Sequence, residues 1–556
     1  MSTNSSSEIR QGSSLASSLP PDVLIEICTM NTFQPWEAYV GTSRWCTHSL
    51  QATNLDWNPD YVRDTTNASH VCRWWRTVIL STPGLWKHMI DPYDPFWSNL
   101  MLERSKSLGI SFSLSKTRWM LGRSGTDLGQ EVIPKFQERL TAYQIFYDGS
   151  SDEEGWKDIR DSMNRCHLLN LKTLSIILPR LPWAKSALPP CFPGPATPSL
   201  KQLHLANCLI YDKHQFSPIG QTLTHLVIDG VYGNQDNILE YCADMAVRVD
   251  TVEVLRTLPR LQTLYLVKAL EFPNKWSGVQ YRPLVFEELR EFRLSNDMSP
   301  YVVEFLRCLR FPNPLSSFSL EVTFPFNNVD PDTQDVFLDL SESVLSKMTP
   351  FTVVEFDYST GLTCSNSPPH AQRLFHTRLI TSYYGPIFFL SWLSFIKRLY
   401  LRTFPGTSHA HRLSVHNVTQ DLKEDALKIL GRHGQVRVLG HVNAVVWNLL
   451  LERGIPEDDV TTCRDRACIP PELKEISFDI THISMEDPGA QTGAKCISRI
   501  KKVKEPKVPD VLNVHDLIKF CQRHKSIQVV RFPDISEEEL EKLKRYMQPL
   551  SVEVRK

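Results

Sequence analysis

The stretch Leu200-Lys201-Gln202-Leu203-His204-Leu205-Ala206-Asn207-Cys208 carries leucine at its first, fourth and sixth positions and cysteine at its ninth. This spacing is the pattern L-x-x-L-x-L-x-x-N/C, which marks one short strand of a repeated unit. Successive side chains of a strand point to opposite faces, so Leu203 and Leu205 are predicted to enter one core together. A single copy could occur by chance in a strand of any α/β protein, so the prediction depends on how often the pattern returns.

The shorter core L-x-x-L-x-L returns along the chain, with other apolar residues in place of some leucines. The clear copies are Leu140/Tyr143/Ile145, Leu171/Leu174/Ile176, Leu223/Leu226/Ile228, Leu261/Leu264/Leu266, Leu289/Phe292/Leu294 and Leu315/Phe318/Leu320. Weaker copies are Val353/Phe356/Tyr358, Ile396/Leu399/Leu401, Leu473/Ile476/Phe478 and Ile527/Val530/Phe532, with a poor copy at Val436/Leu439. The recurrence predicts an α/β repeat over residues 140–535.

The copies are spaced unevenly. The clear copies begin as close as Leu200 and Leu223 and as far apart as Leu223 and Leu261, and the weaker copies lie farther apart still. Regular leucine-rich repeats, by contrast, recur every 20–29 residues. No single unit buries its apolar face alone, so neighbouring units are expected to stack. We therefore expect an irregular leucine-rich-repeat solenoid, followed over 536–556 by a C-terminal helix, opened by a Ser536/Glu539 capping box, and a tail.

Composition narrows the class of protein. Of the 556 residues, 42% are hydrophobic and 22% charged, which suits a globular chain with buried cores. The net charge of −1 argues against a nucleic-acid partner. Residues 1–18 are Ser-rich and expected to be disordered, and the longest apolar run, 383–396, is too short to span a membrane. We expect no membrane partner, a location in the cytoplasm and/or nucleus, and free thiols.

Sequence motifs for catalysis are missing. There is no G-x-x-x-x-G-K-[ST], no H-E-x-x-H and no G-x-S-x-G. Cys463 and Cys468 have no second pair at zinc spacing. We therefore expect no catalytic residues, no cofactor and no metal site. An enzyme whose active site leaves no local motif stays open as an alternative.

Two amphipathic segments precede the repeats. Proline in the first turn and Asp22 just behind it predict a helix that begins near Leu19-Pro20 and runs to Cys28. Val71, Trp74, Trp75 and Val78 have the spacing of one helical face, and a turn at residues 81–84 follows. A unit of about 70 residues with two short helices cannot bury all its apolar surface, so the remaining face is expected to meet a partner.

These segments resemble an F-box, whose family pattern is L-P-x-E-[IVL]-L-x-x-I, then V-C/S-[RK]-x-W-R, then L-W. The chain has Leu19-Pro20, Val71-Cys72-Arg73-x-Trp75-Arg76 and Leu85-Trp86. The segment 102–108 (LERSKSL) resembles L-E-R-S-x-x-x-L, common behind the F-box in large fungal families. The resemblance covers 19–90, and residues 91–139 are expected to connect it to the repeats. An insert at 31–66 departs from the family spacing and is either a surface loop or a translated intron.

The resemblance implies a non-catalytic substrate-receptor subunit of an SCF-type cullin–RING ubiquitin ligase. Its F-box would bind the Skp1 adaptor, and through it a cullin, while the repeats bind an unknown protein substrate. The implied Skp1-binding residues are Leu19, Pro20, Val23, Leu24, Ile27, Val71, Cys72, Trp75, Leu80, Leu85 and Trp86. Trp75 and Trp86 could equally belong to the unit's own core. The insert keeps a second function open, a leucine-rich-repeat scaffold without ligase association.

A substrate surface follows from the strand alternation. In a solenoid, strand residues between the core leucines point to the opposite, concave face. The residues predicted to bind substrate there are His204, His225, Tyr265, Arg293, Arg398, Tyr400 and Arg402. Solvated strand residues without a role are the alternative for each of them.

Overall fold

The fold comes from a computed structural model of the whole chain. The described residues are 19–32, 65–87, 95–115, 136–146, 156–157, 160–161, 163, 165–178, 197–208, 216–229, 251–270, 282–297, 300–324, 331–348, 351, 353–357, 361–365, 375–381, 398–399, 402, 410–416, 435–453, 473–478, 482–484, 511–532, 537–548 and 550–554. The chain forms two compact units, residues 1–289 and 290–556.

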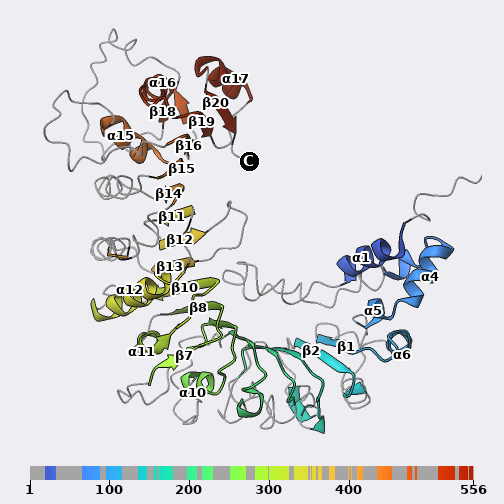
Figure 1. The fold of residues 1–556 in the computed structure, drawn as a ribbon. Coiled ribbons are helices and arrows are strands. Elements are labelled where there is room, and N and C mark those ends of the chain that lie inside the picture. The colour runs from blue at the N-terminus through green and yellow to red at the C-terminus, as the bar shows by residue number, and fades with distance from the viewer. Residues whose placement is uncertain are drawn as a thin grey trace, which may run out of the picture. The chain divides into compact units, whose positions relative to one another are not determined.

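The first unit begins with a group of helices, drawn in blue in Figure 1. They are α1 (Pro21–Thr32), α4 (Arg73–Ser81), α5 (Pro83–Trp86) and α6 (Pro95–Arg104). Helix α1 packs against α4 and α5, and α5 packs against α6. We call this group the helical unit.

Local chemistry explains where these helices begin. Pro21 and Asp22 occupy the first turn of α1, where proline loses no hydrogen bond and a carboxylate meets the positive end of the helix dipole. The Sγ of Cys72 accepts the backbone N–H of Trp75 at 3.5 Å and so caps α4. Pro83 opens α5 in the same way as Pro21 opens α1.

After the helical unit in the sequence, six strands pair in chain order, and every pairing among them is parallel. They are β1 (Ile110–Ser115), β2 (Leu140–Phe146), β3 (Thr173–Ile177), β4 (Gln202–Ala206), β5 (His225–Asp229) and β6 (Thr263–Val267). Figure 1 shows β1 and β2 side by side. The unit also contains the short helices η7 (Ser217–Ile219) and α10 (Thr251–Arg256) and the short strand β7 (Leu284–Val285).

The predicted leucines pair with one another across these strands. Leu174 lies opposite Leu203, and Leu203 lies opposite Leu226 of the next strand. Leu226 in turn lies opposite Leu264. All four are 0% exposed. The repeat copies of the first unit therefore form paired strands that share one buried face, as predicted. At the ninth position of the pattern, Cys208 Sγ donates to the carbonyl oxygen of Ile176 in the neighbouring strand at 3.6 Å.

The second unit contains more strands and longer helices. Its elements are β8 (Glu291–Asp297), α11 (Pro300–Cys308), β9 (Leu309–Arg310), β10 (Ser317–Phe324), α12 (Pro331–Leu345), β11 (Val353–Asp357), β12 (Gly361–Ser365), β13 (Phe375–Thr381), β14 (Arg412–His416), β15 (Val438–Val442), α15 (Ala444–Arg453), β16 (Glu475–Phe478), β17 (His482–Ser484), β18 (Val511–Asn513), α16 (Val514–Arg523), β19 (Val529–Phe532), α17 (Glu537–Tyr546) and β20 (Ser551–Val554). Figure 1 shows α11, α12 and α15 on the same side of the strand row.

The strand row of the second unit runs β8-β10-β13-β12-β11-β14-β15-β16-β19-β20. Neighbouring strands along it pair in parallel, except in the two pairings that β12 makes, with β11 and with β13. Strands β12 and β13 enter the row between β10 and β11, an insertion that the repeat pattern did not predict. Aromatic side chains line the apolar face of this strand row. The ring centroids of Phe292 and Phe318 are 5.7 Å apart and those of Phe318 and Phe375 are 5.4 Å apart, both pairs stacked.

Three predictions about the path of the chain need correction. Residues 91–139, expected only to connect, contain α6 and β1, and the C-terminal segment 536–556 contains strand β20 besides its predicted helix. The copy at Ile396/Leu399/Leu401 is wrong as a strand, because residues 398, 399 and 402 are helical. The next strand in the row is instead β14, and the poor copy at Val436/Leu439 lies at β15.

The described residues thus form a mixed α/β protein built on mostly parallel strands. Neither row of strands closes on itself into a barrel within the described part of the chain. This is the fold class that the repeats predicted at its coarsest level.

Candidate functional site

The helical unit has a small core of its own. Leu24 and Trp86 are 0% exposed and Leu85 is 2% exposed. The indole Nε1 of Trp86 donates to the carbonyl oxygen of Ile79 at 3.0 Å, so the buried polar atom of the ring is satisfied. These three predicted Skp1-binding residues hold the helices together, which was the alternative considered for Trp86.

Other apolar side chains of the same helices face solvent. Val23 is 40% exposed, Ile27 41%, Val71 54% and Trp74 39%. Val23 and Ile27 are four residues apart on α1. Trp74 lies in the first turn of α4, which packs against α1, and Val71 lies two residues before α4. The Nε1 of Trp74 donates to the carbonyl oxygen of Leu19 at 3.2 Å and so ties the two helix starts together. We call Val23, Ile27, Val71 and Trp74 the apolar patch.

The remaining predicted Skp1-binding residues lie in the same segments of the chain and differ in exposure. Pro20 is exposed, and Leu19, Cys72, Trp75 and Leu80 are half-buried. Trp74 was not among the predicted residues, because it occupies the variable position of the C-R-x-W-R pattern. Its spacing from Val71 was the sequence signal that could have identified it.

The face of the first strand row opposite the leucines carries both polar and apolar side chains and is largely covered. His204 lies opposite Ser175 in the pairing of β3 with β4, and Ser175 Oγ and His204 Nδ1 are 3.1 Å apart. His204 is only 2% exposed, and burial lowers its pKa from 6.5 to about 4, so the ring is neutral near pH 7. The expectation of an accessible side chain is therefore wrong for His204.

Two further predicted residues lie on this face. His225 is half-buried, with its Nδ1 2.8 Å from the hydroxyl of Thr224. Tyr265 is half-buried on β6. It lies opposite Val227 of β5, which in turn lies opposite His204 of β4, so these side chains share one face. Both remain partly accessible on a mainly covered surface.

Asp229 ends β5 on the same face and was not predicted. It is 8% exposed, and its Oδ1 has no hydrogen-bond partner. Burial raises its pKa from 3.8 to about 7, an effect that the positive charge of Lys268 opposes. Its carbonyl oxygen accepts the backbone N–H of Asn207 at 3.0 Å, so the strand end itself is held in place.

In the second unit, Arg293 belongs to a polar cluster around one buried carboxylate. Glu321 on β10 is 7% exposed, and its two oxygens lie 4.0 Å from Arg293 Nη2 and 3.3 Å from His376 Nε2. The other nitrogen of His376 is 2.9 Å from the hydroxyl of Thr363. Arg293 is thus half-buried in a network that spans β8, β10, β13 and β12.

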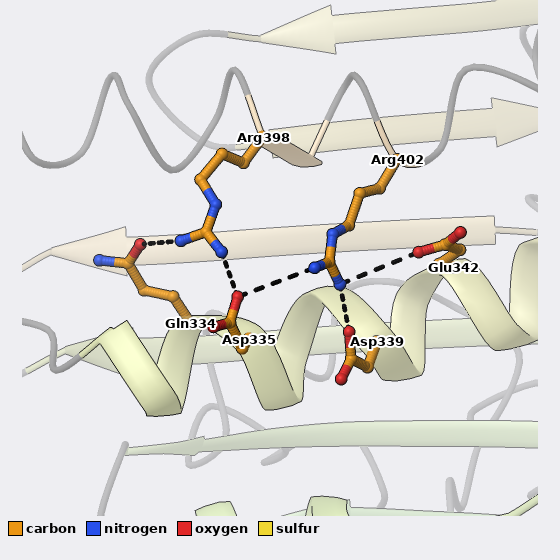
Figure 2. Close-up of polar contacts among 6 residues, drawn as sticks. All are labelled: Gln334, Asp335, Asp339, Glu342, Arg398 and Arg402. Atoms are coloured by element: carbon orange, nitrogen blue, oxygen red, sulfur yellow. Dashed lines mark hydrogen bonds and ion pairs between the residues drawn. The ribbon is translucent and has the colours of Figure 1, made fainter.

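Arg398 and Arg402 lie on a helical segment and face helix α12, not the strand face (Figure 2). Arg398 pairs with Asp335, and its Nη1 donates to Gln334 Oε1 at 3.3 Å. Arg402 pairs with Asp339 and lies 3.9 Å from both Asp335 and Glu342. The prediction that these two arginines stand on a strand face is wrong, because their spacing of four aligns them on one side of a helical turn. The third predicted residue here, Tyr400, lies outside the described residues.

Nothing in the described part of the chain gathers three or more His, Cys, Asp or Glu side chains in a way that could hold a metal ion. Among the described helices, none combines the length and hydrophobicity of a membrane span.

The candidate site therefore consists of surfaces on a mixed α/β protein: the apolar patch of the helical unit and the polar faces of the strand rows. No protein-family model matches the chain, and no curated protein matches it.

Proposed function

We propose that this chain is the substrate-receptor subunit of an SCF-type cullin–RING ubiquitin ligase. In this proposal the helical unit is an F-box that binds the Skp1 adaptor, and through it a cullin. The strand rows form an irregular leucine-rich-repeat solenoid whose polar face binds a protein substrate. The chain itself performs no catalysis, because ubiquitin transfer belongs to a separate enzyme.

The apolar patch is the single observation that carries the adaptor half of the proposal. Isolated exposed apolar residues are ordinary on soluble proteins. Four of them, on or directly before two packed helices, are side chains that the unit's own core does not use. They fall within the segments that resemble the F-box, and Trp74 adds the kind of aromatic anchor that often dominates binding energy.

The repeat half of the proposal is supported by a backbone hydrogen bond that recurs from strand to strand. Just before several strands of both units, a backbone N–H donates to the equivalent carbonyl oxygen of the preceding copy. In the first unit Lys201 donates to Lys172 and Thr224 to Lys201, at 2.9 and 2.8 Å. In the second unit Lys474 donates to Arg437 at 2.7 Å, and Gln528 donates to Lys474 at the same distance. Stacked copies with the same local geometry are what a solenoid requires.

The adaptor half is tested by measuring the affinity of the full-length chain for purified Skp1. Val23→Glu and Trp74→Ala change exposed side chains, so folding should be preserved, and each is expected to weaken binding at least tenfold. A tenfold loss corresponds to about 1.4 kcal/mol. The matched control is Leu169→Glu, which changes a 53% exposed apolar residue outside the helical unit and should leave the affinity unchanged.

The insert is tested in the same assay by deleting residues 33–64, between the end of α1 and the helical turn that begins at residue 65. If only the deletion variant binds Skp1, the insert obstructs the patch. If neither the full chain nor the deletion variant binds, the ligase proposal is wrong. The observation that would then favour the alternative, a repeat scaffold without ligase association, is binding of other proteins by the strand rows alone.

A further inference from the structure

The segment Leu102–Leu108 is placed between the helical unit and the first strand. Leu102 and Ser105 are buried at 5% and 0% exposure at the end of α6. Ser105 Oγ donates to the carbonyl oxygen of Leu102 at 2.9 Å. Lys106 has a φ of 52°, which turns the chain sharply from α6 toward β1.

At one end, this segment holds the core tryptophan of the helical unit. The guanidinium carbon of Arg104 lies 4.4 Å from the ring centroid of Trp86, a cation–π contact. Burial lowers the pKa of Arg104, and the nearby charge of Arg76 on α4 lowers it further. The contact therefore connects α6 to α5 and brings the arginine close to α4.

At the other end, the segment is held by Arg139, which directly precedes β2. Arg139 Nη2 donates to Ser105 Oγ at 2.7 Å. The same guanidinium donates to the carbonyl oxygen of Leu108 through Nε at 3.2 Å and through Nη2 at 3.1 Å. One planar side chain thus ties two points of the turn to the strand row, a geometry that lysine cannot reproduce.

Backbone contacts complete the junction. The N–H of Ser111 on β1 donates to the carbonyl oxygen of Lys87, directly after α5, at 3.0 Å. The N–H of Ile110 donates to the carbonyl oxygen of Arg139 at 2.8 Å. A Cβ on Gly109 would lie 2.4 Å from Thr141 Cγ2, so glycine permits a close approach of the turn to β2.

We infer that residues 102–108 and Arg139 form a clamp that fixes the helical unit against β1 and β2. Arg104 and Arg139 are its positioning residues, since they act on the helices through Trp86, Ser105 and Leu108. A protein held by the apolar patch is then kept at a defined position relative to the first strand row. The clamp depends on the proposed function only for the identity of the bound protein, which that function gives as Skp1.

The clamp is tested on the full-length chain by time-resolved energy transfer between fluorophores on two non-natural amino acids. These replace Arg73 on α4 and Lys201 beside β4, which are both exposed. Arg139→Gln and Arg104→Gln are each expected to broaden the distance distribution at least twofold. The matched control is Arg165→Gln, since the Nε of Arg165 donates to the carbonyl oxygen of Asp161 in its own turn, at 3.2 Å.

Two further measurements separate positioning from general instability. Hydrogen exchange of peptides covering β1 should accelerate in Arg139→Gln, while peptides covering β4 to β6 keep the wild-type rate. Affinity for Skp1 should stay within twofold of wild type, because neither arginine belongs to the apolar patch. Ser105→Ala keeps Arg139 but removes one of its acceptors, and it should broaden the distribution to a smaller extent.

The inference is overturned if the distance distribution stays as narrow in Arg139→Gln and Ser105→Ala as in wild type. It is also overturned if Arg165→Gln broadens the distribution equally. Failure of the proposed function gives a different result. In that case wild type does not bind Skp1, while the energy-transfer and exchange results still decide whether the clamp exists.

Discussion

Asp229 offers the sharpest quantitative prediction from this structure. Its carboxyl group is buried at the end of β5, and burial raises its pKa from 3.8 to about 7. One pKa unit corresponds to about 1.4 kcal/mol, so ionising this group in the folded chain costs about 4 kcal/mol relative to the unfolded chain. Asp229→Asn removes the titration while keeping the size and shape of the side chain.

The sign of the effect follows from proton binding. Between pH 4 and pH 7 the folded chain keeps a proton on Asp229 that the unfolded chain has lost, so the wild type loses stability as the pH rises. Above pH 7 the full cost is present and the loss levels off. Relative to wild type, Asp229→Asn should therefore gain up to about 4 kcal/mol between pH 4 and pH 8. Lys268 works against the shift, so removing its charge should enlarge the gain.

The assay is urea unfolding of both chains at a series of pH values between 4 and 8.5. Groups other than Asp229 titrate in both proteins and cancel in the difference. The amide of the variant can add a constant offset, so the test is the slope of the difference against pH. Glu288→Gln is the matched control, because it neutralises an exposed carboxylate of the same unit. A difference between Asp229→Asn and wild type that is flat from pH 4 to pH 8 would refute the reasoning.

Three other variants test packing and ion pairing. Leu203→Ala opens a cavity in the fully buried leucine row and should lower the free energy of unfolding by about 2–5 kcal/mol in urea melts. Gly440→Ala should cost about 1–3 kcal/mol. Its new Cβ would lie 2.4 Å from Ser414 Oγ, so adding Ser414→Ala should recover part of the loss in a double-mutant cycle. Arg398→Ala removes one partly exposed ion pair, with Asp335, and should cost only about 0–1 kcal/mol, less in high salt. A larger loss in melts at low and high salt would contradict this.

The sequence predicted the strand rows because their signal is local. The pairing of Leu203 with Leu226 follows from two copies of a pattern that each strand carries within six residues. Strands β12 and β13 carry no such pattern. They enter the row because β12 pairs antiparallel with its sequence neighbours β11 and β13, and β13 then pairs in parallel with β10. A pattern search therefore finds the repeated strands and misses the inserted ones.

Arg398 and Arg402 show how a local pattern can mislead. Ile396, Leu399 and Leu401 satisfy L-x-x-L-x-L, yet a spacing of four between the arginines suits a helical turn equally well. What distinguishes the two is the acidic stripe of Asp335 and Asp339 on α12, more than 60 residues earlier. An ion pair over that distance in sequence cannot be inferred from the segment itself.

The burial of His204 was unpredictable for a different reason. Strand alternation correctly places its side chain on the face opposite the leucines, beside Ser175. Alternation does not say whether that face is open to solvent, because this depends on what the rest of the chain lays over it. Accessibility on the polar faces therefore differs from residue to residue, and His225 and Tyr265 are better candidates for contact than His204.

The contrast between Trp74 and Trp86 decides which variants can test the function. Both indole N–H groups donate to backbone carbonyl oxygens, so neither ring has an unpaired polar atom. The two rings differ in their exposure. Trp86 is fully buried under Arg104, and its loss would damage folding and binding together. Trp74 is 39% exposed, so folding alone gives little reason for an aromatic ring there. Trp74→Ala also removes the hydrogen bond to Leu19, which is worth about 0.5–1.5 kcal/mol. Its binding loss is therefore assigned to the surface only if the variant stays folded in urea melts and Val23→Glu gives a similar loss.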